Sequence, residues 1–129
     1  MRNTSKIGSL GEDLACRFLM KHAFSIIDRN YRKSYGEIDI IAKKAGNIHF
    51  IEVKSVSREN IDSISHETDS YNPEENIHPM KLKRLLKTAQ IYLLEKDIQS
   101  EWQMDALAVF IDSAKQKAYF RYTENINVS

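Results

Sequence analysis

The sequence of 129 residues contains a single cysteine, Cys16, and no long apolar run. One cysteine cannot form an internal disulfide, and such usage is typical of a protein in a reducing, cytoplasmic compartment. The missing apolar run argues against a transmembrane helix and against a membrane partner. Residues 1–10 lack the apolar centre of a secretory signal, so we expect no such peptide. The four histidines are scattered, which argues against a zinc site.

The chain also has almost no net charge, because its 19 basic and 18 acidic residues sum to +1. The acids are unevenly placed: residues 56–79 hold six acids and one base, Arg58. The remaining 18 basic and 12 acidic residues give the rest of the chain a net charge of +6. A basic body is compatible with a polyanionic partner. An ordinary soluble surface with one acidic loop is the simpler interpretation of the charge alone.

The hydrophobic pattern predicts one domain over residues 1–129, with two helices and five strands. Apolar residues at helical spacing indicate helices over residues 9–23, with Ser9 as N-cap, and over residues 80–95. Runs of β-branched residues indicate strands over residues 25–32, 38–43, 48–55, 103–111 and 115–122. Residues 56–79 show no sustained period and are expected to form a mobile acidic loop. The order α-β-β-β-α-β-β predicts an α/β fold with a mixed β-sheet flanked by helices.

Charged residues lie inside the strands of the predicted hairpin GEIDIIAKKAGNIHFIEVK, residues 36–54. Side chains alternate along a strand, so Glu52 and Lys54 share one face, and a matching register would bring Asp39 toward them. Two carboxylates about 4 Å apart repel by roughly 4 kcal/mol at an effective dielectric of about 20. A divalent cation would compensate this repulsion, and carboxylates without cysteine or histidine neighbours suit Mg²⁺ or Mn²⁺.

Two further residues near this hairpin each allow more than one interpretation. Glu12 falls within the apolar arc of the first predicted helix, where it either completes a metal site or forms a capping box with Ser9. Lys54 beside the carboxylates could orient or deprotonate an attacking water and neutralise a phosphorane, which suits phosphodiester hydrolysis. Alternatively, Lys54 forms a buried ion pair with Glu52 or lies on an exposed strand edge. The short pattern alone favours this alternative.

A set of spaced motifs reverses that preference. The motifs are GEDLACRFL (11–19), RNYR (29–32), GEIDII (36–41), FIEVK (50–54), K-x(7)-A-x(2)-YL (81–93) and MDALAVF (104–110). In this order they resemble the YraN-type family of small bacterial proteins, which is similar to Holliday-junction resolvases. That family belongs to the PD-(D/E)xK, restriction-endonuclease-like superfamily. The resemblance covers most of the chain and implies a restriction-endonuclease-like fold.

The resemblance also implies roles for individual residues. Asp39, Glu52 and Glu12 would bind Mg²⁺ or Mn²⁺ together with the backbone carbonyl of Val53, and Lys54 would be the catalytic lysine. The substrate class implied is branched or structured DNA, cleaved by a homodimer because two strands must be cut. Gln103 departs from the family pattern, which usually has Arg-Phe-Asp at the start of the late strand. Any phosphate or structural pairing made by that arginine is therefore in doubt.

Basic residues near the predicted site are candidates for DNA contacts. Arg29, Arg32 and Lys33 at a strand end, and Lys81 on the second helix, could bind phosphates. The alternative for the strand-end residues is a solvated surface. We interpret the chain as a cytoplasmic, metal-dependent nuclease-like protein that binds DNA. A DNA-binding module with weak or no catalysis is the second interpretation, and a structural domain that binds neither metal nor DNA is the third.

Overall fold

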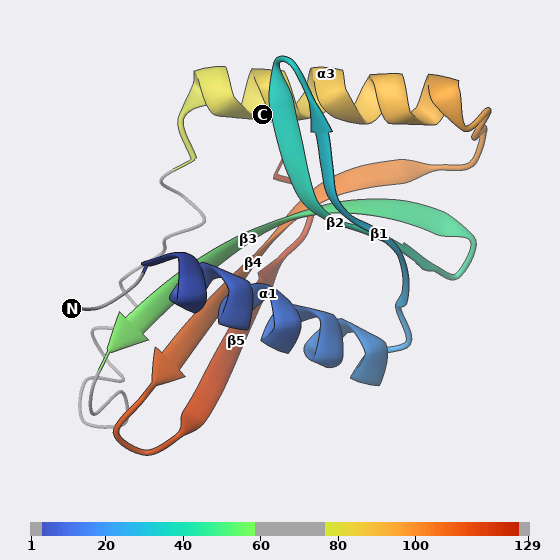
Figure 1. The fold of residues 1–129 in the computed structure, drawn as a ribbon. Coiled ribbons are helices and arrows are strands. Elements are labelled where there is room, and N and C mark those ends of the chain that lie inside the picture. The colour runs from blue at the N-terminus through green and yellow to red at the C-terminus, as the bar shows by residue number, and fades with distance from the viewer. Residues whose placement is uncertain (1–3, 59–76, 127–129) are drawn as a thin grey trace.

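The helices and strands of the computed structural model follow the predicted order (Figure 1). The structure describes residues 4–58 and 77–126. The elements are α1 (Thr4–Lys21), β1 (Ser25–Lys33), β2 (Gly36–Lys44), β3 (Asn47–Arg58), α3 (Pro79–Glu95), β4 (Trp102–Asp112) and β5 (Lys117–Thr123). The predicted α/β class and the order α-β-β-β-α-β-β are confirmed.

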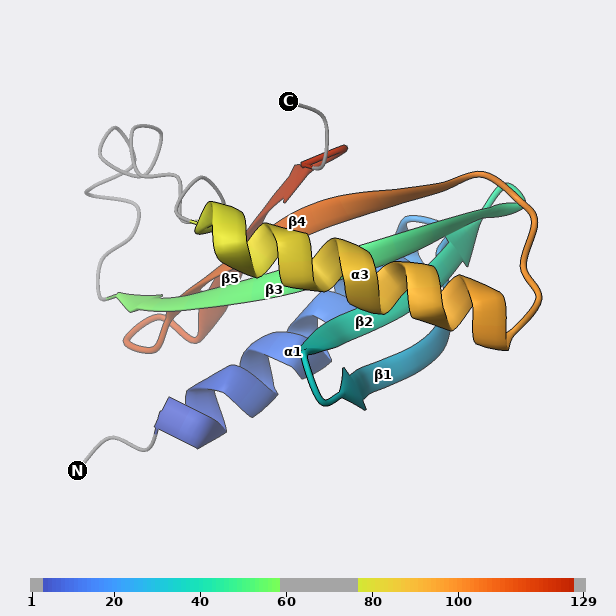
Figure 2. The same cartoon turned by 90° about the horizontal axis from the view of Figure 1, so that it is seen from above.

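The five strands form one mixed sheet in the order β1-β2-β3-β4-β5. Neighbouring strands are antiparallel except β3 and β4, which run parallel. A parallel pair needs a long crossover connection, and α3 lies in that connection. The two helices lie on opposite faces of the sheet (Figure 1 and Figure 2). This is the sheet flanked by helices that the sequence predicted.

Each helix covers its own hydrophobic core. The main residues of the core under α1 are Ala15, Leu19, Ile40, Ala42, Ile51, Leu107 and Val109. Those of the core under α3 are Ile38, Ile41, Phe50, Leu85, Ala89, Tyr92 and Met104. Because both faces of the central strands are covered, β4 reads as a nearly continuous apolar run. No helix in the described part of the chain is long and apolar enough to cross a membrane.

Two predicted boundaries differ from the structure by three or more residues. The first helix begins at Thr4 and not at Ser9, so Glu12 lies in the middle of α1, beyond the turn whose backbone N–H groups need caps. The capping-box interpretation of Glu12 therefore fails. The predicted acidic loop begins too early, because β3 continues to Arg58 along β4. The remainder of that predicted loop, residues 59–76, lies outside the described residues.

The sheet divides between β2 and β3. Their antiparallel ladder ends at the pair Ile40–Ile51, after which β2 continues along β1 and β3 continues along β4. The β1–β2 hairpin then approaches α3 (Figure 1). Gly36 at its tip packs so closely that a Cβ there would lie 2.7 Å from Thr88 Oγ1. Asp39 stands at the position where the two strands separate.

On the other face, Gly11 lets α1 approach β3. A Cβ at Gly11 would lie 1.7 Å from Ser55 Oγ and 2.8 Å from Ser55 Cβ. Rotation of the Ser55 side chain would move its Oγ but not its Cβ. The helix therefore needs glycine here, although glycine is a poor helix former.

We expect Gly11→Ala to lower the free energy of unfolding by about 1–2 kcal/mol, because the overlap outweighs the gain in helix propensity. Gly8→Ala is the matched control in the same helix, since a Cβ at that position would meet no described atom within 4 Å beyond its chain neighbours and the backbone of its own helix. Urea unfolding of both variants measures the difference. The Gly11→Ala/Ser55→Gly double variant should have the same free energy of unfolding as the Ser55→Gly single variant, or a higher one. A penalty that persists in the double variant contradicts the steric explanation.

Candidate active site

Asp39 is positioned by the backbone of the neighbouring strand. Continuation of the β2–β3 register places it opposite Glu52. Its carboxylate replaces a ladder hydrogen bond, because the Val53 N–H donates to Asp39 Oδ2 at 2.8 Å. The site thus lies where the β2–β3 ladder ends and the Asp39 side chain, in place of the backbone of β2, accepts a hydrogen bond from β3.

Asp39 and Glu52 form a closely coupled acid pair. Burial raises the pKa of Asp39 to about 8, and the charge of Glu52 and a hydrogen bond between the two carboxyls contribute to the increase. Glu52 is buried, and among the described residues no donor reaches its Oε2. A buried polar atom without a partner is costly. A proton held between the carboxyls offsets this cost, and a bound cation would do so as well.

Lys54 lies on the same strand face as Glu52. The uninterrupted pairing of β3 with β4 preserves the alternation of side chains, and Phe50 on this face belongs to the core under α3. Lys54 is exposed, whereas Val53 between the two is half-buried against the core under α1. The alternative in which Lys54 pairs with Glu52 is not observed, because Glu52 pairs with Lys81.

Glu12 approaches the acid pair from α1. Burial raises its pKa, and the charge of Asp39 raises it further, so the two carboxyls are electrostatically coupled. Arg29 lies on the other side, with its guanidinium 3.6 Å from Glu12 Oε1. With its amide nitrogen toward the acids, Asn30 donates to Glu12 Oε1 at 3.1 Å and to Glu37 Oε1 at 3.0 Å. Glu12 is therefore near the site and already held by two neighbours.

The predicted phosphate-binding residues all make internal ion pairs. The pairs are Arg29–Asp13 at 3.0 Å, Arg32–Glu37 at 2.9 Å, Lys33–Glu95 at 2.8 Å and Lys81–Glu52 at 3.2 Å. Arg29, Arg32 and Lys33 belong to β1, whereas Lys81 lies in the first turn of α3. Lys81 is thus the one that pairs with a member of the acid pair, whereas Arg29 lies beside the predicted ligand Glu12.

Asn30 was missed by the sequence predictions. Its φ of 55° lies in the left-handed region, which asparagine tolerates better than most residues. The asparagine within RNYR was the available signal, but its contacts depend on three separate elements. Its amide links α1 and β2, and so fixes Glu12 with respect to the dividing strands.

The donor set fits a hard divalent cation. Within residues 4–58 and 77–126, no cluster of three or more histidine, cysteine, aspartate or glutamate side chains converges on one point. The candidate metal ligands that lie close together are the Asp39 carboxylate and the Glu52 oxygen that has no described hydrogen-bond partner. Two carboxylates suffice for Mg²⁺, which keeps several waters and uses substrate phosphates as further ligands. The structure thus brings Asp39 and Glu52 together and leaves Glu12 beside them.

Gln103, which stands at the position of the expected arginine, has a structural partner. Its Nε2 donates at 2.8 Å to Oδ1 of the buried Asp105. His49 Nδ1 lies 2.7 Å from Asp105 Oδ2, and the Tyr122 hydroxyl and the Asn125 N–H also donate to this carboxylate. Asp105 therefore has its acceptor sites occupied, and we interpret this cluster as part of the core.

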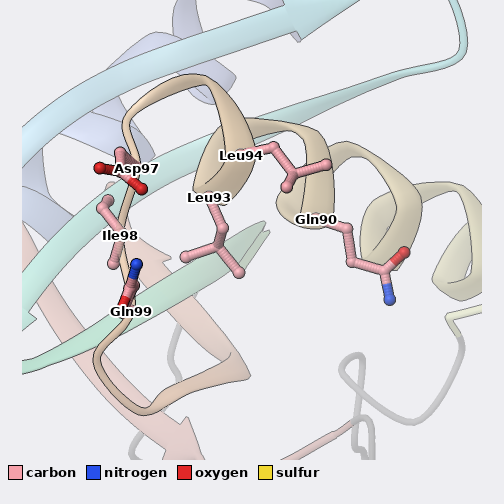
Figure 3. A pocket seen from close by; sticks show the side chains of 6 residues that line it. All are labelled: Gln90, Leu93, Leu94, Asp97, Ile98 and Gln99. Carbon is pink, nitrogen blue, oxygen red and sulfur yellow. The ribbon is translucent and has the colours of Figure 1, made fainter.

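A hollow of about 470 Å³ lies at the C-terminal end of α3 (Figure 3). It is lined by Gln90, Leu93, Leu94, Asp97, Ile98 and Gln99. Gln90 is nine residues beyond Lys81, or roughly 13 Å along the helix, so the hollow is separate from the acid pair. Asp97 is its sole charged residue, so no coupled acid–base pair lines it.

Comparison with known proteins identifies relatives over most of the chain. A UPF0102 protein of Campylobacter jejuni is 38% identical over 93% of this chain and 92% of its own length. One from Helicobacter pylori is 39% identical over 92% of this chain and 89% of its own, and one from Wolinella succinogenes is 41% identical over 78% and 82%. A solved structure, Pyrococcus furiosus SfsA in complex with Ca²⁺, aligns with a TM-score of 0.37 and 16% identity. That alignment covers 95% of this chain and 64% of the SfsA chain.

The family model also covers the elements that build the site. It matches residues 11–109, from the close helix contact at Gly11 through the acid pair and α3 to Val109 of β4. These relatives are 38–41% identical to this chain over 78–93% of its length. The family predicted from the spaced motifs is therefore confirmed, and the chain belongs to the uncharacterised protein family UPF0102.

Proposed function

We propose that this protein is a metal-dependent endonuclease-like protein that binds DNA and hydrolyses phosphodiester bonds in branched or structured DNA. The observation that carries the proposal is the acid pair. Burial, followed by the charge of Glu52, raises the pKa of Asp39 to about 8, and no described residue donates to the buried Oε2 of Glu52. An exposed lysine lies two residues away on the same strand face.

In this proposal Asp39, Glu52, Glu12 and the carbonyl of Val53 hold Mg²⁺ or Mn²⁺. When bound, the ion supplies Lewis acidity at the scissile phosphate. Lys54 orients the attacking water and places positive charge where the phosphate gains negative charge. The attacking water loses a proton to solvent as its oxygen forms the new P–O bond, the ester P–O bond breaks, and the departing oxygen takes a proton from solvent.

DNA binding in this proposal comes from dispersed basic residues. Arg29, Arg32, Lys33 and Lys81 would exchange their internal acid partners for backbone phosphates, each with a modest, salt-dependent contribution. Branched DNA is included because of the resemblance to resolvases. Such a substrate presents two strands to be cut, so we propose that the protein acts as a homodimer in the cytoplasm. Sedimentation velocity with and without a four-way junction tests whether the dimer assembles.

The test of activity is single-turnover cleavage of a four-way junction, a flap and a linear duplex in Mg²⁺ and in Mn²⁺. Binding to the same DNAs is measured in Ca²⁺. We expect cleavage of the branched substrates, and its loss in Glu52→Gln, which keeps the size of the side chain. Binding without cleavage in either metal would favour the DNA-binding module. Neither metal nor DNA binding would favour the structural domain.

A further inference from the structure

Lys81 forms an ion pair at the proposed metal site. Its Nζ lies 3.2 Å from Glu52 Oε1, and the pair joins the first turn of α3 to β3. Figure 2 shows α3 lying across the sheet face that includes β3. The Glu52 side chain is 10% exposed and the Lys81 side chain is 51% exposed. Lys81 therefore approaches a buried carboxylate from solvent.

The cation of Lys81 and a divalent ion would compete for the same carboxylate. Two positive charges a few ångströms apart repel, so an ion bound between Asp39 and Glu52 disfavours the ammonium on Glu52 Oε1. Lys81 has a long flexible stem, and half of its side chain is already in solvent, so it can leave at little cost. Lys54, by contrast, makes no ion pair with either acid among the described residues, and its side chain is exposed.

We propose that Lys81 is a counter-ion that a divalent cation displaces from Glu52, and that the released ammonium then binds a phosphate of the nucleic acid. This proposal rests on the proposed function, because it assumes a metal at the acid pair. It goes further by coupling the two ligands. A metal that releases Lys81 strengthens phosphate binding, and a phosphate that holds Lys81 strengthens metal binding by the same factor.

The charge of the surrounding helix supports this role. From Pro79 to Leu94, α3 carries Lys81, Lys83, Arg84 and Lys87 and no acidic residue. A displaced Lys81 therefore has no acid in this stretch of its own helix to pair with. A phosphate beside the acid pair is then the natural new partner, and the ammonium would lie on the solvent side of the bound cation.

The experiment is a calorimetric titration with Mn²⁺ alone, at the same pH for every variant. Lys81→Gln should bind Mn²⁺ roughly three- to tenfold more tightly than the wild type, because the competing ammonium is gone. Lys83→Gln removes an equal charge from an exposed position of the same helix and should remain within about twofold of the wild type. Lys81→Met, which keeps most of the aliphatic stem, should agree with Lys81→Gln.

The coupling is measured by titrating Ca²⁺ with and without a short DNA duplex. The duplex should raise Ca²⁺ affinity more in the wild type than in Lys81→Gln, by a factor of up to the gain that this substitution gives for Ca²⁺ without DNA. Equal Mn²⁺ affinities in the wild type and both Lys81 variants would overturn the displacement proposal but leave the metal site intact. A wild type that binds no Mn²⁺ would instead overturn the proposed function on which it rests.

Discussion

Replacing Asp39 by asparagine should stabilise the metal-free protein and abolish its stabilisation by Mg²⁺ or Mn²⁺. The pKa of Asp39 is raised from 3.8 to about 8, so the folded protein holds a proton that the unfolded chain releases. The free energy of unfolding therefore falls as pH rises between these values. Asparagine keeps an oxygen for the Val53 N–H and turns its amide nitrogen toward Glu52, so it imitates the protonated acid without titrating.

The expected gain at neutral pH is at least about 1 kcal/mol, or roughly 3–5 °C in Tm. This gain in stability should be small below the pKa of 3.8 that Asp39 has in the unfolded chain, and it should grow toward pH 8. Added metal should raise the Tm of the wild type by mass action and leave the variant unchanged. Thermal melts across this pH range, with and without metal, measure both effects. Asp97→Asn removes an exposed acid elsewhere and serves as the control. An undiminished metal response in Asp39→Asn would place the metal at another site.

Replacing Lys54 by alanine should cut the cleavage rate by roughly 10²-fold or more while leaving DNA affinity nearly unchanged. The ammonium acts mainly in the transition state, where the phosphate carries extra negative charge. Ground-state binding comes from several basic residues, each of which contributes modestly. Dissociation constants in Ca²⁺ and single-turnover rates in Mg²⁺ separate the two effects.

Arg32→Ala provides the opposite pattern. Arg32 is exposed and lies at the end of β1, where its guanidinium pairs with Glu37 across the hairpin. Its loss should weaken DNA binding and flatten the salt dependence of that binding. The effect on the cleavage rate of bound DNA should be smaller. If Lys54→Ala weakened DNA binding as much as Arg32→Ala and left the cleavage rate of bound DNA unchanged, Lys54 would be a phosphate contact and not a catalytic residue.

The sequence predicted the acid pair because strand alternation and the hairpin register leave little freedom. Once β2 and β3 pair across the Ala45–Gly46 turn, Asp39 must come close to Glu52. The division of the sheet at Asp39 was not predictable in the same way. It depends on the packing of the hairpin tip against Thr88, a residue 52 positions beyond Gly36 in the chain.

The partners of charged side chains were the least predictable part of the site. Lys81 was correctly placed near the site, but a partner 29 residues away in sequence cannot be inferred from local spacing. Lys33 and Glu95, 62 positions apart, present the same difficulty. The early start of α1 was missed because residues 4–8 carry no apolar stripe and the Ser9–Glu12 spacing imitates a capping box.

The hydrogen bond from Val53 to Asp39 also limits how the proposed site could select its ion. It engages Oδ2 of Asp39, and this contact would remain after a cation had displaced Lys81 from Glu52, so Asp39 would offer mainly its Oδ1. Ca²⁺ prefers six to eight oxygen ligands and often takes both oxygens of a carboxylate, whereas Mg²⁺ accepts single oxygens and fills its octahedron with water and phosphate. Single-oxygen coordination by Asp39 would therefore favour the smaller ion at the proposed site, and a backbone amide of the sheet would contribute to that preference.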